Sequence, residues 1–321
     1  MFSCSCFFSL DAENLRYDSV TYYQEKAIGL YRKSAWKEAI STYSILTKYD
    51  SLPVKAQAYL NIALCYRKMN QKDSSRINVD RSVNILNRLP PSYFKYNSLL
   101  KSGILFKNYG YYESAIEQLT IAYKGFTEIS NDAKKATLCN ILAETHRLIG
   151  NQEMATRYYH ENLSLSKLIG DSLKISNSYN ALGNLHKSLD QSDSAIFYYK
   201  EAIHLQESTP TKKELGRKYH NLGTVYYKDK NYNLAEKNFL DALALKSETE
   251  DYRSLPYTLN ELAMLAVLQN KNEEAESYLK KSFQHIGSIS NQDVVARYHY
   301  VHYRYLKSLY KRRKHLQPEN K

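Results

Sequence analysis

The chain contains little glycine and proline, with ten glycines and six prolines among 321 residues. Average proteins hold more than twice that share, so the composition disfavours turn-rich all-β architectures. The longest unbroken apolar stretch is the seven residues Leu262–Leu268, whereas a membrane-spanning helix needs about 20. Of the four cysteines only Cys4 and Cys6 lie close together, which indicates neither a disulfide framework nor a zinc site.

Motifs of common nucleotide-binding and hydrolytic enzymes are also missing. The sequence has no GxGxxG, no Gly-Lys-Ser/Thr, no GxSxG and no HExxH. His299 and His302 can share a helix face, but two histidines without a third ligand are weak evidence for a metal. Cys65 and Cys139 are predicted to be small buried hydrophobic residues. We therefore expect no catalysis, no cofactor and no metal.

The net charge of +12 is concentrated near the end of the sequence. From Arg297 onward there are eight basic residues and one acidic residue, Glu319. A strongly basic segment is one signal of nucleic-acid binding. Tyrosine, with 31 copies, is the other unusual feature, and it suits half-buried helix faces whose hydroxyl groups reach water.

A repeat of 40 residues organises the sequence. Small residues recur at Ala27, Ala63, Gly103, Ala143, Gly183, Gly223 and Ala263, and a second small series follows each by twelve positions. Apolar or aromatic residues follow the first series by sixteen positions, at Tyr43, Val79, Leu119, Tyr159, Tyr199, Phe239 and Leu279. Apolar spacings of three and four within each unit indicate buried helical stripes, so each unit is predicted to be two antiparallel helices.

The pattern resembles the tetratricopeptide repeat (TPR) family. The residues that carry the resemblance are Tyr219, Leu222, Gly223, Tyr226, Ala235, Phe239 and Ala242, with a second copy at Tyr179, Leu182, Gly183, Ala195, Tyr199 and Ala202. The resemblance implies an all-α, right-handed superhelical solenoid of helix-turn-helix repeats. We expect seven repeats over about residues 20–290 and a C-terminal capping helix over about 292–315. The period of 40 and the absence of a closing proline depart from the usual family pattern of 34.

In this family the first helix of each repeat lines an inner groove, where ligands resembling extended peptides usually bind. The candidate residues for contact with partner backbone are Asn140, Asn180, Asn184, His220 and Asn260. Asparagine both donates and accepts hydrogen bonds, so a series of asparagines suits main-chain recognition. The alternative is that these amides order neighbouring helices.

A basic series lies four positions after the small residue of several repeats. It comprises Arg67, Lys107, Arg147, Lys187 and Lys307, to which we add Arg217, Arg297 and Arg304 as candidates for acidic groups of a partner. The alternative is that cations in the last turn of a helix stabilise its dipole.

The final helix combines a basic face with an apolar stripe. The basic face holds Arg297, Arg304, Lys307, Lys311 and Lys314, and the stripe holds Val294, Tyr298, Val301, Tyr305 and Leu309. The stripe suits a cap on the last repeat. The basic face is either a solvated surface or, with interleaved tyrosines, a nucleic-acid contact.

We divide the chain into an N-terminal segment 1–16, a TPR solenoid 17–316 and a tail 317–321. Ser3-Cys4 resembles the end of a lipoprotein leader, so segment 1–16 is either a remnant of such a leader or a frayed N-terminus. The first reading places the protein at a membrane or outside the cell, and the second in the cytoplasm. The predicted function is a non-catalytic scaffold that binds a protein or peptide, acidic in one version, as in sensing regions of signalling proteins. The alternative is a basic regulator whose C-terminal helix contacts nucleic acid. The sequence leaves the oligomeric state open.

Overall fold

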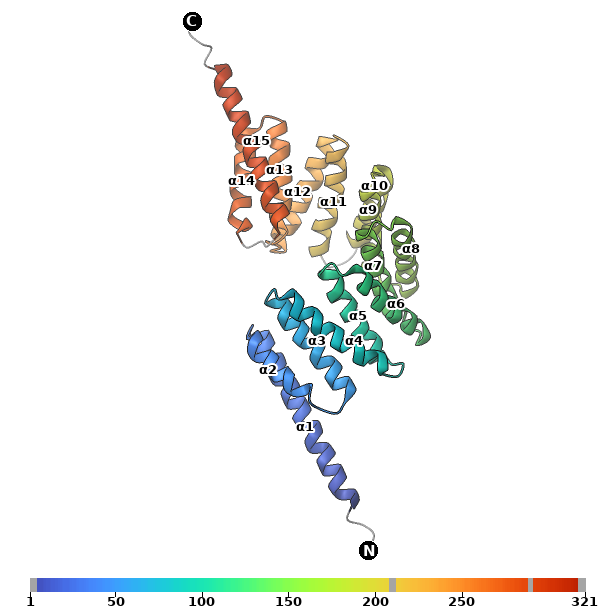
Figure 1. Ribbon diagram of the computed structural model, residues 1–321. Coiled ribbons are helices and arrows are strands. Elements are labelled where there is room, and N and C mark those ends of the chain that lie inside the picture. Colours follow the sequence, from blue (N-terminus) through green and yellow to red (C-terminus); the bar gives the residue numbers. More distant parts are fainter. Residues whose placement is uncertain (1–4, 208–211, 288–290, 317–321) are drawn as a thin grey trace. The chain divides into compact units, whose positions relative to one another are not determined.

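The computed structural model describes residues 5–207, 212–287 and 291–316, and these ranges contain fifteen helices and no strand (Figure 1). The helices group into two compact units, residues 1–165 and 166–321, with the border inside α8. Each unit is described by itself below.

The helices of each unit alternate along the chain. In the first unit they are α1 (Ser5–Arg32), α2 (Trp36–Leu46), α3 (Leu52–Lys68), α4 (Lys72–Arg88), α5 (Tyr93–Asn108), α6 (Tyr112–Glu128), α7 (Asp132–Leu148) and α8 (Gln152–Ile169). In the second unit they are α9 (Ser172–Ser188), α10 (Ser192–Glu207), α11 (Lys213–Lys228), α12 (Tyr232–Glu248), α13 (Leu255–Leu268), α14 (Asn272–Ile286) and α15 (Gln292–Leu316). We call the odd-numbered helices A helices and the even-numbered ones B helices. Each A helix with the B helix that follows it forms one predicted repeat.

Close packing within a repeat depends on the small residues that the period identified. A Cβ atom added at Gly183 would lie 2.6 Å from the ring of Tyr199, and one at Gly223 would lie 2.7 Å from the ring of Phe239. These partners stand sixteen positions after the glycines, as the sequence pattern indicated. The A and B helices can approach this closely because the glycines carry no side chain.

The turn from each A helix to its B helix uses one residue in the left-handed conformation. These residues are Ser34, Asn70, Gly110, Gly150, Asp190, Lys230 and Asn270, with φ between 57° and 82°. At Gly110 the backbone N–H bonds to the carbonyl of Lys107 at 3.0 Å, and the next N–H, of Tyr111, reaches Phe106 at 3.0 Å. This pair of bonds satisfies the last carbonyls of the helix.

The cores of both units are continuous layers of apolar residues between successive helices. In the first unit Leu99, Leu119 and Phe126 are fully buried, and in the second unit Tyr199 and Phe239 are. Cys65 and Cys139 are also fully buried, as predicted. Burial raises the pKa of the Cys65 thiol to about 11, so it is protonated at neutral pH.

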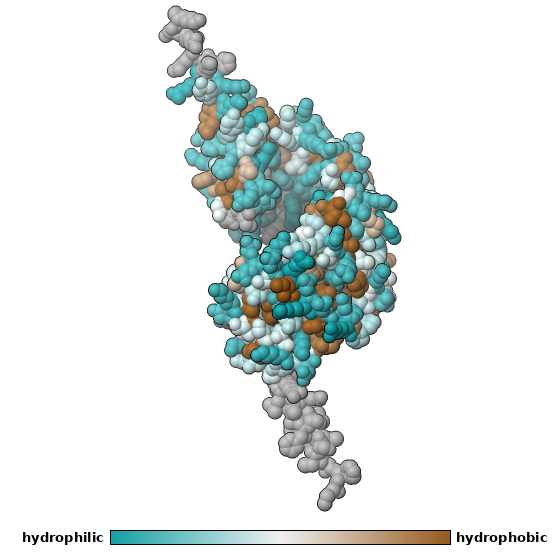
Figure 2. Space-filling view, in the orientation of Figure 1, coloured by the Kyte–Doolittle hydropathy of each residue, from teal (hydrophilic) through white to brown (hydrophobic). Residues whose placement is uncertain are grey.

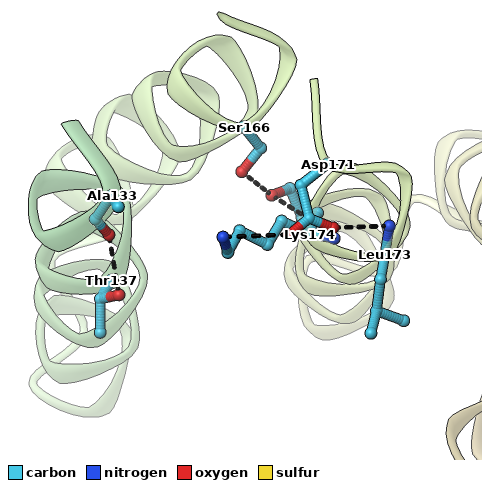
Figure 3. A network of polar contacts seen from close by, with 7 residues as sticks. Ala133, Thr137, Ser166, Asp171, Leu173 and Lys174 are labelled. Carbon is cyan, nitrogen blue, oxygen red and sulfur yellow. Dashed lines mark hydrogen bonds and ion pairs between the residues drawn. The ribbon is translucent and has the colours of Figure 1, made fainter. Parts of the chain in front are cut away.

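Helix α9, the first A helix of the second unit, begins with a side-chain cap (Figure 3). Asp171 Oδ1 accepts hydrogen bonds from the backbone N–H groups of Leu173 and Lys174, both at 3.1 Å. The Lys174 ammonium lies 3.0 Å from Asp171 Oδ2. Hydrogen bonds from Lys174 hold the pKa of the Asp171 carboxyl below its ordinary value. The cap fixes where α9 starts, and α9 carries several of the candidate site residues.

The all-α, helix-turn-helix fold class is confirmed over the described ranges, and α15 lies where the capping helix was predicted. Helix α1 begins at Ser5, inside the segment that we separated as 1–16. The single solenoid over 17–316 stays a prediction because the two units are described separately. The predicted tail 317–321 and the side chain of Lys314 lie outside the described part of the chain.

Candidate functional site

Three asparagine side chains from two A helices meet in the second unit. The Nδ2 of Asn221 in α11 donates to Asn180 Oδ1 at 3.2 Å and to Asn184 Oδ1 at 3.4 Å, both in α9. Asn184 Oδ1 also accepts from the hydroxyl of Tyr199 at 2.7 Å. We call Asn180, Asn184 and Asn221 the amide cluster. Each of its three residues is partly exposed to solvent.

Sequence reasoning singled out Asn180 and Asn184 but missed Asn221 as a site residue. Its signal was available, because Asn221 lies two positions before the small residue Gly223. In the first unit Asn61 holds the same position relative to Ala63 and accepts a hydrogen bond from Gln57 Nε2 at 2.9 Å. Gln57 and Asn61 line a groove of about 350 Å³ together with Gln24, Ile28, Tyr31, Tyr43 and Leu64. Amides at this position therefore reach the surface in both units.

Asn260 does not reach a surface, and its proposed contact with partner backbone does not fit its burial. The side chain is fully buried, where Nδ2 donates to the Val294 carbonyl at 3.2 Å and Oδ1 accepts from Ser282 Oγ at 2.7 Å. These bonds join α13 to α14 and α15, so the amide orders neighbouring helices. This was the alternative reading of the asparagine series.

His220 is held inside the second unit in a similar way. Its Nδ1 lies 3.1 Å from Thr258 Oγ1, and its ring packs against Phe239 with centroids 5.5 Å apart. Burial lowers the pKa of His220 well below its usual range, and the nearby charges of Lys246 and Lys187 lower it further. The imidazole is therefore neutral at physiological pH.

Two of the predicted residues lie openly on A helices of the first unit. Asn140 in α7 and Arg67 in α3 are both exposed. Neither side chain has a hydrogen bond or ion pair within the part of the chain that the structure describes. Their positions fit the predicted groove, although they stand on different repeats and are not brought together.

The basic series is partly neutralised by carboxylates of neighbouring repeats. The Lys107 ammonium in α5 contacts the Glu144 carboxylate in α7. Arg147, also in α7, hydrogen-bonds the hydroxyl of Tyr159. Lys187 in α9 is half-buried and lies near enough to His220 to affect its pKa. The predicted uniform strip of positive charge is therefore interrupted.

Two further cations of the prediction are ion-paired in the second unit. Arg297 Nε and Nη2 donate to the two oxygens of Glu261 at 2.9 and 2.6 Å, which is a bidentate pair. Arg217 Nη2 lies 2.5 Å from Glu214 Oε2 on the same helix. These arginines are not available as uncompensated charges for an acidic partner.

Arg304 and Lys307 instead line an open groove of about 990 Å³ at α15. The other lining residues are Val267, Leu268, Asn270, Asn272, Tyr300, Tyr303, Ser308, Lys311 and Arg312. None of the lining residues is acidic. The groove therefore collects four cations that the ion pairs of the second unit leave unneutralised among the described residues.

Apolar surface does not dominate the visible face of the molecule. In Figure 2 hydrophobic residues form small groups among hydrophilic ones on that face. No helix in the described ranges is long and apolar enough to span a bilayer. Those ranges also hold no group of three histidine, cysteine or carboxylate side chains placed to bind a metal.

Structure comparison finds the same fold in several solved proteins. A signal transduction ATPase with numerous domains (STAND) from Pyrococcus horikoshii, which has a tetratricopeptide repeat sensor, aligns with a TM-score of 0.65 and 17% identity. The alignment covers 84% of this chain and 42% of that one, so this chain spans less than half of the STAND protein. Aspartyl phosphate phosphatase F from Bacillus subtilis aligns at 0.63 and 15% identity, covering 90% of this chain and 79% of the phosphatase.

A Rap protein solved in complex with competence and sporulation factor aligns with a TM-score of 0.62 and 14% identity. That alignment covers 90% of this chain and 82% of the Rap protein. Identities this low establish the fold and not a shared activity. A search of curated protein sequences gives no match.

Family models described as tetratricopeptide repeat match residues 56–85, 134–208 and 214–285. Together these ranges cover more than half of the chain. They agree with the helix pairs of the structure and with the 40-residue period. The chain therefore belongs to the tetratricopeptide repeat family.

Proposed function

We propose that the protein is a non-catalytic interaction scaffold that binds an extended segment of a partner protein along α9 and α11. The observation that carries the proposal is the amide cluster of Asn180, Asn184 and Asn221. The fold and its neighbours suggest a protein-interaction or sensing scaffold in general terms. The amide cluster narrows this to a particular place in the second unit.

The hydrogen bonds inside the cluster leave specific groups for a ligand. Oδ1 of Asn180 and Oδ1 of Asn184 both accept hydrogen bonds from Asn221. Their Nδ2 groups, and the Oδ1 of Asn221, have no hydrogen-bond partner among the residues that the structure describes. The cluster thus presents two donors and an acceptor in fixed orientations. Extended backbone offers alternating carbonyl and N–H groups that match such a set.

The surroundings of the cluster restrict the partner's character. Lys187 lies one helical turn after Asn184 on α9 and raises the local positive potential. Arg217 is already paired with Glu214. Backbone recognition therefore dominates, and a single acidic side chain near Lys187 adds to it. This is weaker than the fully basic strip that the sequence suggested.

Selection from a displayed library of random peptides, followed by affinity titration of the selected peptides, tests the proposal. Asn180→Ala/Asn221→Ala removes amide groups from both helices. A neutral hydrogen bond contributes about 0.5–1.5 kcal/mol. We therefore expect the double variant to bind the selected peptides about tenfold or more weakly, with helix content unchanged.

The matched control is Asn233→Ala, which removes an exposed amide from the B helix α12. It should leave peptide affinity at the wild-type value. Selected peptides that bind the double variant as tightly as they bind the wild type would refute the proposal. A selection that yields no binding peptide from the folded wild-type chain would refute it as well.

A further inference from the structure

We propose that the groove at α15 binds single-stranded nucleic acid, a function separate from the peptide scaffold proposed above. The site is made by Tyr300, Tyr303, Arg304, Lys307, Lys311 and Arg312, which we call the α15 groove. All six line the same open groove beside the C-terminal end of α13 and the start of α14. The neutral residues Asn270, Asn272 and Ser308 complete its wall.

The charge of the α15 groove is uncompensated, unlike that of the other predicted cations. Lys107, Arg217 and Arg297 each contact a carboxylate. Over the described part of α15, the four cations of the groove make no ion pair, and the only acidic residue of that helix is Asp293 in its first turn. Unpaired cations gathered in a groove attract a polyanion and release its counterions.

Tyrosine rings accompany two of these cations. The Arg304 guanidinium lies 5.9 Å from the ring centroid of Tyr300, and Arg304 Nη1 donates to that residue's hydroxyl at 3.0 Å. The Lys307 ammonium lies 5.7 Å from the ring centroid of Tyr303. Both tyrosines are about half exposed, at 45% and 57%. Each pair therefore offers a positive charge and an accessible aromatic face.

This repeated pairing favours nucleic acid over an acidic peptide. Each nucleotide of a single strand carries one phosphate and one aromatic base, so it can use both members of a pair. Aspartate and glutamate use only the charge. The two pairs are offset by three residues, about 4.5 Å along the helix, and the stretch 300–312 is about 18 Å long. That length accommodates a few nucleotides.

Fluorescence anisotropy with labelled 12-nucleotide oligouridine and oligothymidine tests the proposal on the full chain. Neutralising four phosphates on a single strand gives a salt slope near −3. We therefore expect about a fiftyfold loss of affinity between 50 and 200 mM salt. Tighter binding of one of the two probes distinguishes RNA from DNA, and either result supports the site.

Two variants separate charge from stacking. Arg304→Glu/Lys307→Glu should weaken binding at least tenfold and flatten the salt slope, because phosphate contacts are lost. Tyr300→Ala/Tyr303→Ala should weaken binding about tenfold or more while leaving the salt slope as in the wild type. The pair Arg304→Gln/Lys307→Gln provides a milder charge variant if the glutamates disturb α15.

The control Lys200→Glu/Lys237→Glu makes the same charge change on exposed positions of the B helices α10 and α12. An equal loss in this control would overturn the proposal, since net charge alone would then explain binding. So would tighter binding of a labelled twelve-residue glutamate peptide than of both oligonucleotides, or no oligonucleotide binding at 50 mM salt. Asn180→Ala/Asn221→Ala should not change oligonucleotide affinity, so failure here is distinct from failure of the peptide site.

Discussion

Two lysine side chains lie inside the second unit with only uncharged oxygen atoms around their ammonium groups among the described residues. Lys246 Nζ donates to the Ser254 carbonyl at 3.0 Å and to Thr258 Oγ1 at 2.8 Å. Lys218 Nζ donates to Asn177 Oδ1 at 2.9 Å and also to Gln206 Oε1. The two side chains are 1% and 2% exposed. Burial lowers the pKa of each to about 8.

These lysines make the stability of the second unit depend on pH. In the unfolded chain a lysine titrates near 10.4, so between about pH 8 and 10 the unfolded state binds more protons than the folded state. The free energy of unfolding therefore rises with pH in that window. We expect each lysine to contribute on the order of 2 kcal/mol between pH 7.5 and 9.5.

Lys246→Met should remove about half of this rise, which urea denaturation of both proteins across that pH range measures. Lys237→Met, an exposed change on the same helix, is the control and should leave the rise intact. An unchanged pH dependence in Lys246→Met would show that its ammonium is solvated in the folded protein.

Individual site residues were the part that the sequence predicted least well. Asn180 and Asn260 occupy equivalent positions two repeats apart, yet Asn260 is buried and Asn180 is not. The difference arises because α14 and α15 supply Ser282 and Val294 as partners for Asn260. Likewise the carboxylate that neutralises Arg297 is 36 residues away in sequence. Contacts between repeats of this kind are not visible in a single-helix pattern.

At the scale of the helix pair, the packing is set by one small residue and one large partner sixteen positions later. Gly183 contacts the fully buried ring of Tyr199, whose hydroxyl is fixed by Asn184. Gly103 contacts Leu119 in the same way, with an added Cβ only 2.6 Å from it. The period exposed these pairs because every repeat solves the same packing problem with the same register.

Gly183→Ala should destabilise the second unit by about 1–3 kcal/mol, because the new methyl group overlaps a ring that cannot move away. Gly29→Ala is the matched control, since nothing lies within 4 Å of the added Cβ in α1. It should be neutral or stabilise by up to about 1 kcal/mol through helix propensity. Urea denaturation with helix content as the signal measures both. Equal destabilisation by the two changes would contradict the packing described for Gly183.

The order and length of the helices were well predicted from sequence for the same reason. The period, the small residues and the apolar spacing all describe one helix pair, and local consistency of this kind defines a repeat fold. The turns were less visible. Lys230 and Asp190 adopt the left-handed conformation that glycine holds at positions 110 and 150, and nothing in their residue type predicts it.

At the scale of the whole chain, the polar groups of the A helices and the cations of α15 are separate features. The amide cluster lies on α9 and α11 and uses uncharged donors. The α15 groove uses charge and exposed tyrosines. A repeat array can carry such independent sites because each repeat contacts chiefly its neighbours. The peptide scaffold remains the central claim, since family and fold both favour it.

Hydrogen–deuterium exchange of the full chain with a library-selected peptide tests this claim most directly. The account predicts slower exchange on peptide binding in α9 and α11, residues 172–188 and 213–228, with the B helices α10 and α12 little changed on their outer positions. Protection confined to other helices, with α9 and α11 exchanging as in the free protein, would contradict it.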